Sequence, residues 1–336
     1  MPLEALRYPI TPAGLHYLLI HYDIPDVDAS GWSLSIEGRV ARPLTLTLAD
    51  LRERPAHEVT STMECAGNGR ALLAPHVVSQ PWLLEAVGNA RWKGVPLRTI
   101  LEEAELLDDA VEVVFTGLDR GVEKGVEQSY QRSLERDIAL EDDVLLAYEM
   151  NGAPLLPQHG FPLRLLVPGW YGMTNVKWLT AITVVDEPFD GYQHTAAYRY
   201  RDTEEDEGTA VTRMMPRALM VPPGIPDFNT RERTVLAGRC PLFGRAWSGW
   251  APISHVEVST DDGETWADAE LEPLESRWGW RGWRFEWAAD KPGDYVLYCR
   301  ARDEAGNVQP DEADWNIGGY SNNSPQRVPV TVQTVG

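Results

Sequence analysis

The first two hundred residues mix short stretches of helical and of strand periodicity. Apolar residues recur at helical spacing over 82–87 and 97–106, and each stretch predicts a short helix. Apolar and β-branched runs predict strands at 111–115, 163–167 and 179–185. These segments lack the regular strand–helix–strand alternation of a doubly wound sheet, and no GxGxxG motif follows a strand. The pattern therefore predicts a mixed α+β domain without a dinucleotide-binding fold.

The pattern changes near residue 205. Residues 201–208 form a charge run that predicts a solvent-exposed linker. Beyond it, short apolar runs alternate with turn signals such as Asp261-Asp262-Gly263, which is typical of an antiparallel sandwich of immunoglobulin type. The predicted strands are 235–247, 253–259, 266–271, 283–287, 295–302 and 328–332. We therefore expect two domains, an α+β domain over 1–205 and an all-β domain over 206–336.

The second domain holds clustered tryptophans and two of the three cysteines. Its clustered tryptophans, which we expect to be anchors of the core and of an interface, are Trp278, Trp280, Trp283 and Trp287. Cys240 and Cys299 lie in or near predicted strands. We expect two buried free thiols there, and a disulfide is the alternative that a reducing compartment disfavours.

Charge and hydropathy limit the partners and the location. The chain has 30 basic and 51 acidic residues, and its net charge of −21 disfavours nucleic acid and anionic membranes as partners. No run of about 18 apolar residues predicts a membrane span. The N-terminus lacks the pattern of a signal peptide, and three cysteines fit a reducing compartment, so we expect a cytoplasmic protein.

The segment 62–70, Thr-Met-Glu-Cys-Ala-Gly-Asn-Gly-Arg, carries the most specific chemistry. A thiolate at Cys65 is a soft metal ligand, and the small residues after it let an anionic group approach backbone N–H donors. Arg70 adds a cation, which we expect to lower the pKa of the thiol and to attract anions. Without a CxxC partner, most of the coordination of a metal here would come from outside the protein. The rival interpretation is a small buried apolar cysteine.

Four segments resemble, in order, the motifs of the sulfite oxidase family. They are 62–70, 88–97, 148–164 and 168–179, and the likeness extends over nearly the whole chain. The family consists of molybdenum enzymes whose single protein ligand to the metal is the cysteine of the first motif. The resemblance implies a molybdopterin-binding α+β domain, a plain molybdenum–molybdopterin cofactor, and an immunoglobulin-like domain that pairs two subunits into a homodimer.

The resemblance also implies which residues form the site. Metal binding falls to Cys65, anion binding to Arg70, a pocket wall to Trp82, and a hydrogen bond to the reacting oxygen to Tyr198. The residues implied to bind the cofactor are Tyr17, His21, Cys65, Asp119, His159, Arg164, Asn175, Val176 and Lys177. Taken singly, His159, Lys177 and Tyr198 would read as an ordinary loop histidine, surface lysine and linker-proximal aromatic residue.

Two positions depart from the family. Animal and plant sulfite oxidases have pocket arginines where this chain has Leu19 and Gly318, and Arg199, Arg201 or Arg217 are the candidates to compensate. Each lost charge-assisted contact is worth about 1.5–3 kcal/mol. The departures leave open a substrate other than sulfite.

We expect a molybdenum-dependent oxidoreductase of sulfite oxidase type that oxidises sulfite to sulfate and passes electrons to a separate carrier. The acidic chain suits a basic carrier such as a cytochrome. One alternative keeps the cofactor and fold but acts on another sulfur or oxyanion substrate. An alternative of another class is a non-catalytic immunoglobulin-like interaction protein.

Overall fold

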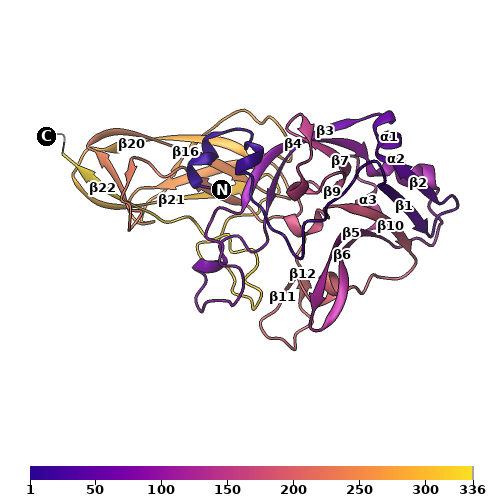
Figure 1. Cartoon of the computed structure of the whole chain (residues 1–336). Helices are drawn as coiled ribbons and strands as arrows, with labels where there is room; N and C mark the ends of the chain where they lie inside the picture. The colour runs from indigo at the N-terminus through magenta and orange to yellow at the C-terminus, as the bar shows by residue number, and fades with distance from the viewer. Residues whose placement is uncertain (335–336) are drawn as a thin grey trace.

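A computed structural model of the chain describes residues 1–334 and has an elongated shape (Figure 1). The two sheets of the mixed first half lie at one end, and the orange to yellow sandwich lies at the other, with the indigo N-terminal segment beside it. Two N-terminal 3-10 helices, Leu3–Arg7 and Ala13–Leu15, precede the first strand. Leu6 of the first of these helices packs with Leu219 and Trp247 of the sandwich, so the N-terminus belongs spatially to the second half.

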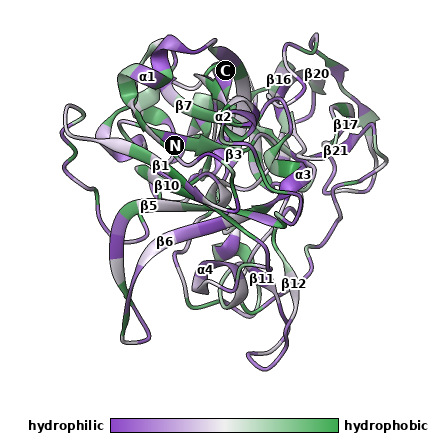
Figure 2. Cartoon of the chain, turned by 90° about the vertical axis from the view of Figure 1, so that its right-hand side faces the viewer, coloured by the Kyte–Doolittle hydropathy of each residue, from purple (hydrophilic) through white to green (hydrophobic). Residues whose placement is uncertain are grey.

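The first half contains two sheets with a shared core. One sheet has the order β2-β1-β10-β5-β6, in which β1 and β10 are parallel and the other pairs antiparallel. Its strands are β1 (Ser33–Gly38), β2 (Leu44–Thr47), β5 (Glu112–Glu123), β6 (Val126–Glu135) and β10 (Leu179–Val185). The β5–β6 hairpin projects from the body of the chain (Figure 2).

The second sheet carries the cysteine motif. Its strands are β3 (His57–Glu64), β4 (Val87–Pro96), β7 (Leu145–Met150) and β8 (Ala153–Pro154), with β9 (Arg164–Leu166) paired to β7. Ile36, Phe115 and Ile182 from the first sheet pack with Leu146 and Leu165 from the second. This burial of apolar area holds the two sheets together.

Short helices connect the strands. The α-helices are α1 (Leu48–Glu53), α2 (Leu97–Ala104), α3 (Arg136–Ala139) and α4 (Tyr192–Thr195). Further 3-10 helices are Arg70–Leu72, Pro157–His159 and Gly172–Thr174. Thr47 and Asp50 form a capping box that starts α1, and Ile100 and Leu101 of α2 join the shared core.

The second half is an all-β sandwich, as predicted. One sheet contains β13 (Arg217–Met220), β16 (Gly238–Trp247), β20 (Arg281–Ala289) and β19 (Glu270–Leu271). The facing sheet contains β14 (Ile225–Pro226), β15 (Arg233–Leu236), β22 (Val328–Gln333), β21 (Gly293–Asp303), β17 (Ile253–Ser259) and β18 (Ala267–Asp268). Leu242 and Trp283 from the first sheet and Leu297, Cys299 and Val330 from the second share one core.

Most of the strand predictions are confirmed, and three element predictions need correction. The single strand predicted at 235–247 covers the end of β15 and the whole of β16, which lie in facing sheets. The predicted helix at 82–87 is wrong, because its backbone bonds outward: the Trp82 carbonyl accepts from Ala71 N, and Ala86 N donates to the Asn68 side chain. The single strand predicted at 266–271 is two short strands, β18 and β19, which pair with different neighbours.

The charge run at 202–207 is exposed, as expected of a linker. It is also the loop that joins β11 (Arg199–Tyr200) to β12 (Thr209–Ala210), which pair with each other across the predicted domain boundary. The boundary at residue 205 stays a prediction.

The cysteine and tryptophan predictions are confirmed within residues 1–334. Cys240 and Cys299 are buried free thiols. All four clustered tryptophans are buried. Trp283 and Trp287 lie in the sandwich core, whereas Trp278 packs in the cluster that contains Cys65, so it anchors the contact between the two halves. None of the helices in that range has the length and apolar character that crossing a bilayer requires.

Candidate active site

Predicted site residues from distant parts of the chain line one cavity. The space inside, including the part open to solvent, is about 600 Å³. The lining residues predicted from the sequence are Tyr17, His21, Cys65, Asp119, His159, Arg164, Asn175, Lys177 and Tyr198. Pockets for drug-sized ligands span about 300–1,000 Å³.

Cys65 lies where β3 ends and a tight loop begins. Its N–H donates to the Ala86 carbonyl and its carbonyl accepts from Asn68 N, both at 2.9 Å. Gly69 has φ of 90°, a left-handed conformation that glycine adopts without strain. The loop therefore presents the Cys65 side chain to the cavity while its own backbone is held by hydrogen bonds.

The expected lowering of the Cys65 pKa is wrong for this structure. Burial raises the pKa of the thiol to about 11, which outweighs the opposing effects of the Gly67 N–H and of Arg70. Arg70 is buried, and its Nε donates to the Gly318 carbonyl at 2.9 Å. Its guanidinium carbon lies 5.4 Å from the ring centroid of Tyr320, so the charge is already engaged beside the loop.

The deep end of the cavity is cationic. The Arg164 guanidinium donates to the carbonyls of His159 and Asn175 at 3.0 and 3.2 Å. Its carbon lies 4.8 Å from the ring centroid of Trp92, and it forms no ion pair within residues 1–334. Its Nε has no hydrogen-bond partner there. Burial lowers the pKa of Arg164 to about 10 and the pKa of Lys177 to about 7. The buried Arg164, which forms no ion pair in the described residues, and the half-buried Lys177, which lies near Asp119, together favour an anionic group at this end of the cavity.

Asp119 offers an acceptor to the same cavity. Its Oδ1 is buried without a hydrogen-bond partner in the described part of the chain, and burial raises the pKa of the carboxyl to about 6. An unpaired buried acceptor near unpaired donors suits a ligand that carries both amines and a phosphate. The residues present therefore fit a molybdopterin, whose pterin and phosphate have these groups.

His21 and Tyr198 close the other side of the cavity. The Tyr198 hydroxyl and His21 Nε2 are 2.5 Å apart, and the His21 ring stacks on Tyr130 at 4.3 Å between centroids. Burial lowers the pKa of His21 to about 3, so the ring is neutral at pH 7 and its Nε2 shares one hydrogen bond with the Tyr198 hydroxyl. Tyr198 has φ of 53°, which is rare outside glycine.

Three predicted residues lie outside the lining. Arg70 flanks the cysteine loop, as described above. Trp82 is half-buried and packs at the edge of the apolar cluster around Cys65. Val176 is fully buried in the core of the first half, and its carbonyl accepts from Leu165 N. Their predicted roles stay predictions.

Sequence reasoning missed His16, Tyr130 and Tyr320. His16 and Tyr130 line the cavity, and Tyr320 lies 5.2 Å from the ring of Tyr198. His16 stacks on Tyr17, and burial lowers the pKa of His16 to about 3. The only available signal for His16 was a histidine five positions before His21.

None of the three arginines considered as compensation reaches into the cavity. Arg199 and Arg201 both donate to the Glu207 carbonyl in the loop between β11 and β12. Arg217 is buried in an ion pair with Glu64. Leu19 lines the cavity, and its carbonyl accepts from Lys177 Nζ at 2.7 Å.

Within residues 1–334, no group of three or more histidine, cysteine, aspartate or glutamate side chains is arranged to hold a metal ion. Cys65 is thus the candidate protein ligand through its position in the cavity, and the remaining ligands would come from the cofactor.

Two family models match the chain. The oxidoreductase molybdopterin binding domain matches residues 21–193, and the Mo-co oxidoreductase dimerisation domain matches 229–333. Mitochondrial sulfite oxidase of Mus musculus is 34% identical over 96% of this chain and 62% of its own length. Sulfite oxidase of Gallus gallus is 35% identical over 92% of this chain and 70% of its own length.

More distant relatives share the architecture. Nitrate reductase [NADH] 1 of Oryza sativa subsp. japonica is 32% identical over 98% of this chain but only 39% of its own length. The crystal structure of the sulfane dehydrogenase SoxCD from Paracoccus pantotrophus superposes with a TM-score of 0.86, at 26% identity, over all of this chain and 86% of that one. The chain spans about three fifths of the length of the mammalian relatives.

These matches confirm the predicted fold class, the predicted molybdopterin cofactor and the predicted relation to sulfite oxidases. The chain belongs to the sulfite oxidase family of molybdopterin-binding oxidoreductases, with a molybdopterin-binding domain followed by a dimerisation domain.

Proposed function

We propose that the protein is a molybdenum-dependent oxidoreductase that oxidises a small sulfur oxyanion, with sulfite as the first candidate. The observation that carries the proposal is the placement of Cys65 in one cavity with the unpaired cation Arg164, the unpaired acceptor Asp119 and the Tyr198–His21 pair. Single residues of these kinds are common in folded proteins. Their convergence on one cavity is what favours a redox site over a structural role.

The bound cofactor would supply the two-electron redox couple and transfer of the oxygen atom. Cys65 would bind the metal through Sγ and would lose its proton on doing so. Because burial raises the pKa of this thiol, it would stay protonated until the metal binds. Arg164 and Lys177 would hold anionic groups of the cofactor, and Asp119 Oδ1 would accept from a pterin amine. Tyr198 would orient the reacting oxygen through its hydroxyl, with neutral His21 as the group that accepts its proton.

Arg70 and Trp82 would form the wall on the substrate side. Arg70 is the one pocket arginine of the family that this chain keeps, and its carbonyl partner Gly318 occupies the position of a lost one. Because Leu19 and Gly318 replace two cations, affinity for a dianion is expected to be lower than in the animal enzymes.

A second candidate substrate follows from the same replacements. Tyr198 lines the cavity and packs against Tyr320, which in turn contacts the Arg70 guanidinium outside the lining, so the wall on this side is aromatic. Such a wall suits a less highly charged sulfur compound. The similar structure from Paracoccus pantotrophus is titled a sulfane dehydrogenase, and a substrate of that class is the alternative.

We also propose a homodimer and a separate electron acceptor. The dimerisation domain supports pairing of two copies, and Phe228, which is 86% exposed, adds apolar surface with Ile225 and Leu236. The net charge of −21 supports a basic electron carrier, such as a cytochrome, as acceptor.

The cytoplasmic location and the domain boundary stay predictions. The non-catalytic alternative has no support from the cavity, because it assigns no role to the unpaired groups there.

The experiment is steady-state turnover of the molybdenum-loaded protein in separate assays. Sulfite and a sulfane compound are each supplied with an artificial electron acceptor, and nitrate is supplied with an artificial electron donor. Saturable oxidation of sulfite supports the first candidate. Turnover of the sulfane compound alone supports the second. Absence of turnover with all three, in a preparation with full molybdenum content, would contradict both.

A further inference from the structure

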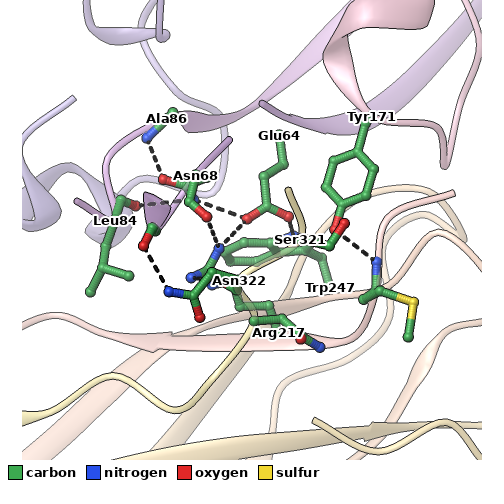
Figure 3. Close-up of polar contacts among 12 residues, drawn as sticks. Glu64, Asn68, Leu84, Ala86, Tyr171, Arg217, Trp247, Ser321 and Asn322 are labelled. Carbon is green, nitrogen blue, oxygen red and sulfur yellow. Dashed lines mark hydrogen bonds and ion pairs between the residues drawn. The ribbon is translucent and has the colours of Figure 1, made fainter. Parts of the chain in front are cut away.

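A buried ion pair joins the two halves of the chain directly beside Cys65. Glu64 is the last residue of β3, and Arg217 is the first residue of β13 (Figure 3). Glu64 Oε1 and Arg217 Nη1 are 2.6 Å apart, and each side chain is only 2% exposed. The residue before the candidate metal ligand is therefore fixed by the sandwich.

Glu64 is fully paired by donors from both halves. Trp247 Nε1 of β16 donates to Oε2 at 2.9 Å, and Asn68 Nδ2 of the cysteine loop donates to Oε1 at 2.9 Å. Asn68 Oδ1 in turn accepts from Ala86 N at 3.0 Å. A carboxylate with this set of donors is held in one orientation.

Arg217 also binds the cysteine loop, through its guanidinium. Its Nη1 donates to the Asn68 carbonyl at 3.3 Å, and its Nη2 donates to the Asn322 carbonyl at 2.5 Å. Asn322 Nδ2 donates to the Gly69 carbonyl at 2.7 Å. A Cβ at Gly69 would lie 2.9 Å from Arg217 Nη2, so the approach of this arginine requires glycine there.

The hydrogen bonds of Glu64 affect the direction of the Cys65 side chain, because the two residues are adjacent at the end of β3. Successive side chains of a strand point to opposite faces. Glu64 points into the network, whereas Cys65 lines the cavity on the other face. A change in the backbone at Glu64 therefore changes the direction of the Cα–Cβ bond at Cys65.

A contribution to stability explains the Glu64–Arg217 pair less well than a role at the cysteine loop does. Buried ion pairs are often no more stabilising than apolar residues of the same size, because both charges lose their hydration. The chain also has another pair between the N-terminal segment and the sandwich, Arg233 with Glu4 at 2.8 Å, and neither of these residues bonds to the cysteine loop.

We infer that Glu64 and Arg217 are positioning residues that fix the direction of the Cys65 thiol and so couple the C-terminal sandwich to the metal ligand. The inference rests on the proposed function only in taking Cys65 as the ligand. Partners of a metal ligand typically affect metal affinity or activity by 10- to 100-fold.

The test compares Glu64→Gln and Arg217→Lys with the matched control Arg233→Met, all as molybdenum-loaded protein. Absorption of the thiolate–metal bond and the electron paramagnetic resonance of the reduced metal report the geometry at Cys65, and both are compared at equal molybdenum content. We expect shifted spectra and a kcat lower by about tenfold with little change of KM in Glu64→Gln. Arg217→Lys, which keeps the charge but loses the forked contacts, is expected to shift less.

The control is expected to lose stability without a spectral shift. Spectra of Glu64→Gln and Arg217→Lys that match the unmodified protein at equal occupancy would overturn the inference, whatever their stability. Should Glu64→Gln not fold, Arg217→Lys decides by the same criterion.

If the unmodified protein binds no molybdenum, the proposed function fails separately. The inference is then tested by the rate at which iodoacetamide alkylates Cys65 in the metal-free protein. A rate at least several times higher in both variants than in Arg233→Met supports it, and equal rates overturn it.

Discussion

The Tyr198 hydroxyl lies 2.5 Å from Nε2 of His21, although 177 positions separate the two residues in the chain. The contact connects the segment before β1 with the segment before β11 in the lining of the cavity that contains Cys65. A short hydrogen bond between a phenol and a neutral imidazole suits transfer of a proton near a reacting oxygen. The first prediction follows from it.

Replacement of Tyr198 by phenylalanine is expected to reduce kcat by about 100-fold, because general acid–base groups typically contribute 10²–10⁴-fold. Loss of one hydrogen bond is expected to cost only about 1 kcal/mol of stability. Tyr200→Phe is the control, since it removes the hydroxyl bonded to Ser321 Oγ at 2.6 Å, outside the lining of the cavity. An equal loss of turnover in both variants would show that Tyr198 acts through the fold.

Asp119→Asn is expected to weaken retention of the cofactor without destabilising the metal-free chain. The pKa of this carboxyl is raised by burial to about 6, so above that pH the folded state holds a charge that the unfolded state solvates better. The variant should therefore unfold at an equal or higher urea concentration at pH 7, while its molybdenum content falls. The exposed Asp290→Asn is the control, and a variant at 119 that keeps its molybdenum would contradict the assigned contact.

The metal-free protein is expected to lose stability as the pH falls from 6.5 towards 4. Burial lowers the pKa of His16 to about 3, whereas the unfolded histidine has a pKa of 6.5. Below pH 6.5 the unfolded state thus binds the extra proton, and the free energy of unfolding falls by up to about 1.4 kcal/mol per pH unit for this group. The free energy of unfolding in urea is measured at pH 7 and at pH 5 for both proteins. Its decrease between the two pH values should be about 1–2 kcal/mol smaller in His16→Gln than in the unmodified chain. Parallel losses in the two proteins would refute this assignment.

Leu19→Arg is expected to lower the KM for sulfite by about tenfold, since a new charge-assisted contact is worth at least about 1.5 kcal/mol. Leu19 is half-buried and lines the cavity, so a longer side chain has room there. Position 318 offers no such room, because a Cβ on Gly318 would lie 2.2 Å from the Tyr320 ring. Leu19→Gln controls for size without charge. A KM that the arginine leaves unchanged would favour the second candidate substrate.

Local patterns predicted much of this fold. The strand at 179–185 appears as β10 with the same bounds, and the helix predicted over 97–106 is α2. Both have strong periodicity and bury one face against a sheet. The segment 82–87 has a similar spacing of apolar residues, but its backbone is hydrogen-bonded to the cysteine loop, and this tertiary contact overrides local preference.

The sequence predicted the residues of the site that belong to short motifs, but not the contacts between distant segments. The cysteine loop and its resemblance led to nine residues that line one cavity. The Glu64–Arg217 pair was not predicted, because its members are 153 positions apart. Glu64 lies in the cysteine motif and Arg217 was considered only as a pocket cation, and nothing in the sequence connects the two. The effect of burial on the Cys65 pKa was also missed, since a sequence shows the neighbouring cation but not the loss of water around the thiol.

The central claim is that Cys65 binds molybdenum, and the most direct measurement is the metal content of protein from a host that makes the cofactor. We expect about one molybdenum per chain in the unmodified protein and little in Cys65→Ser, because the cofactor offers the remaining ligands and this thiol the only one from the protein. A metal-free unmodified protein, or a Cys65→Ser variant that keeps both its molybdenum and its turnover, would contradict the claim.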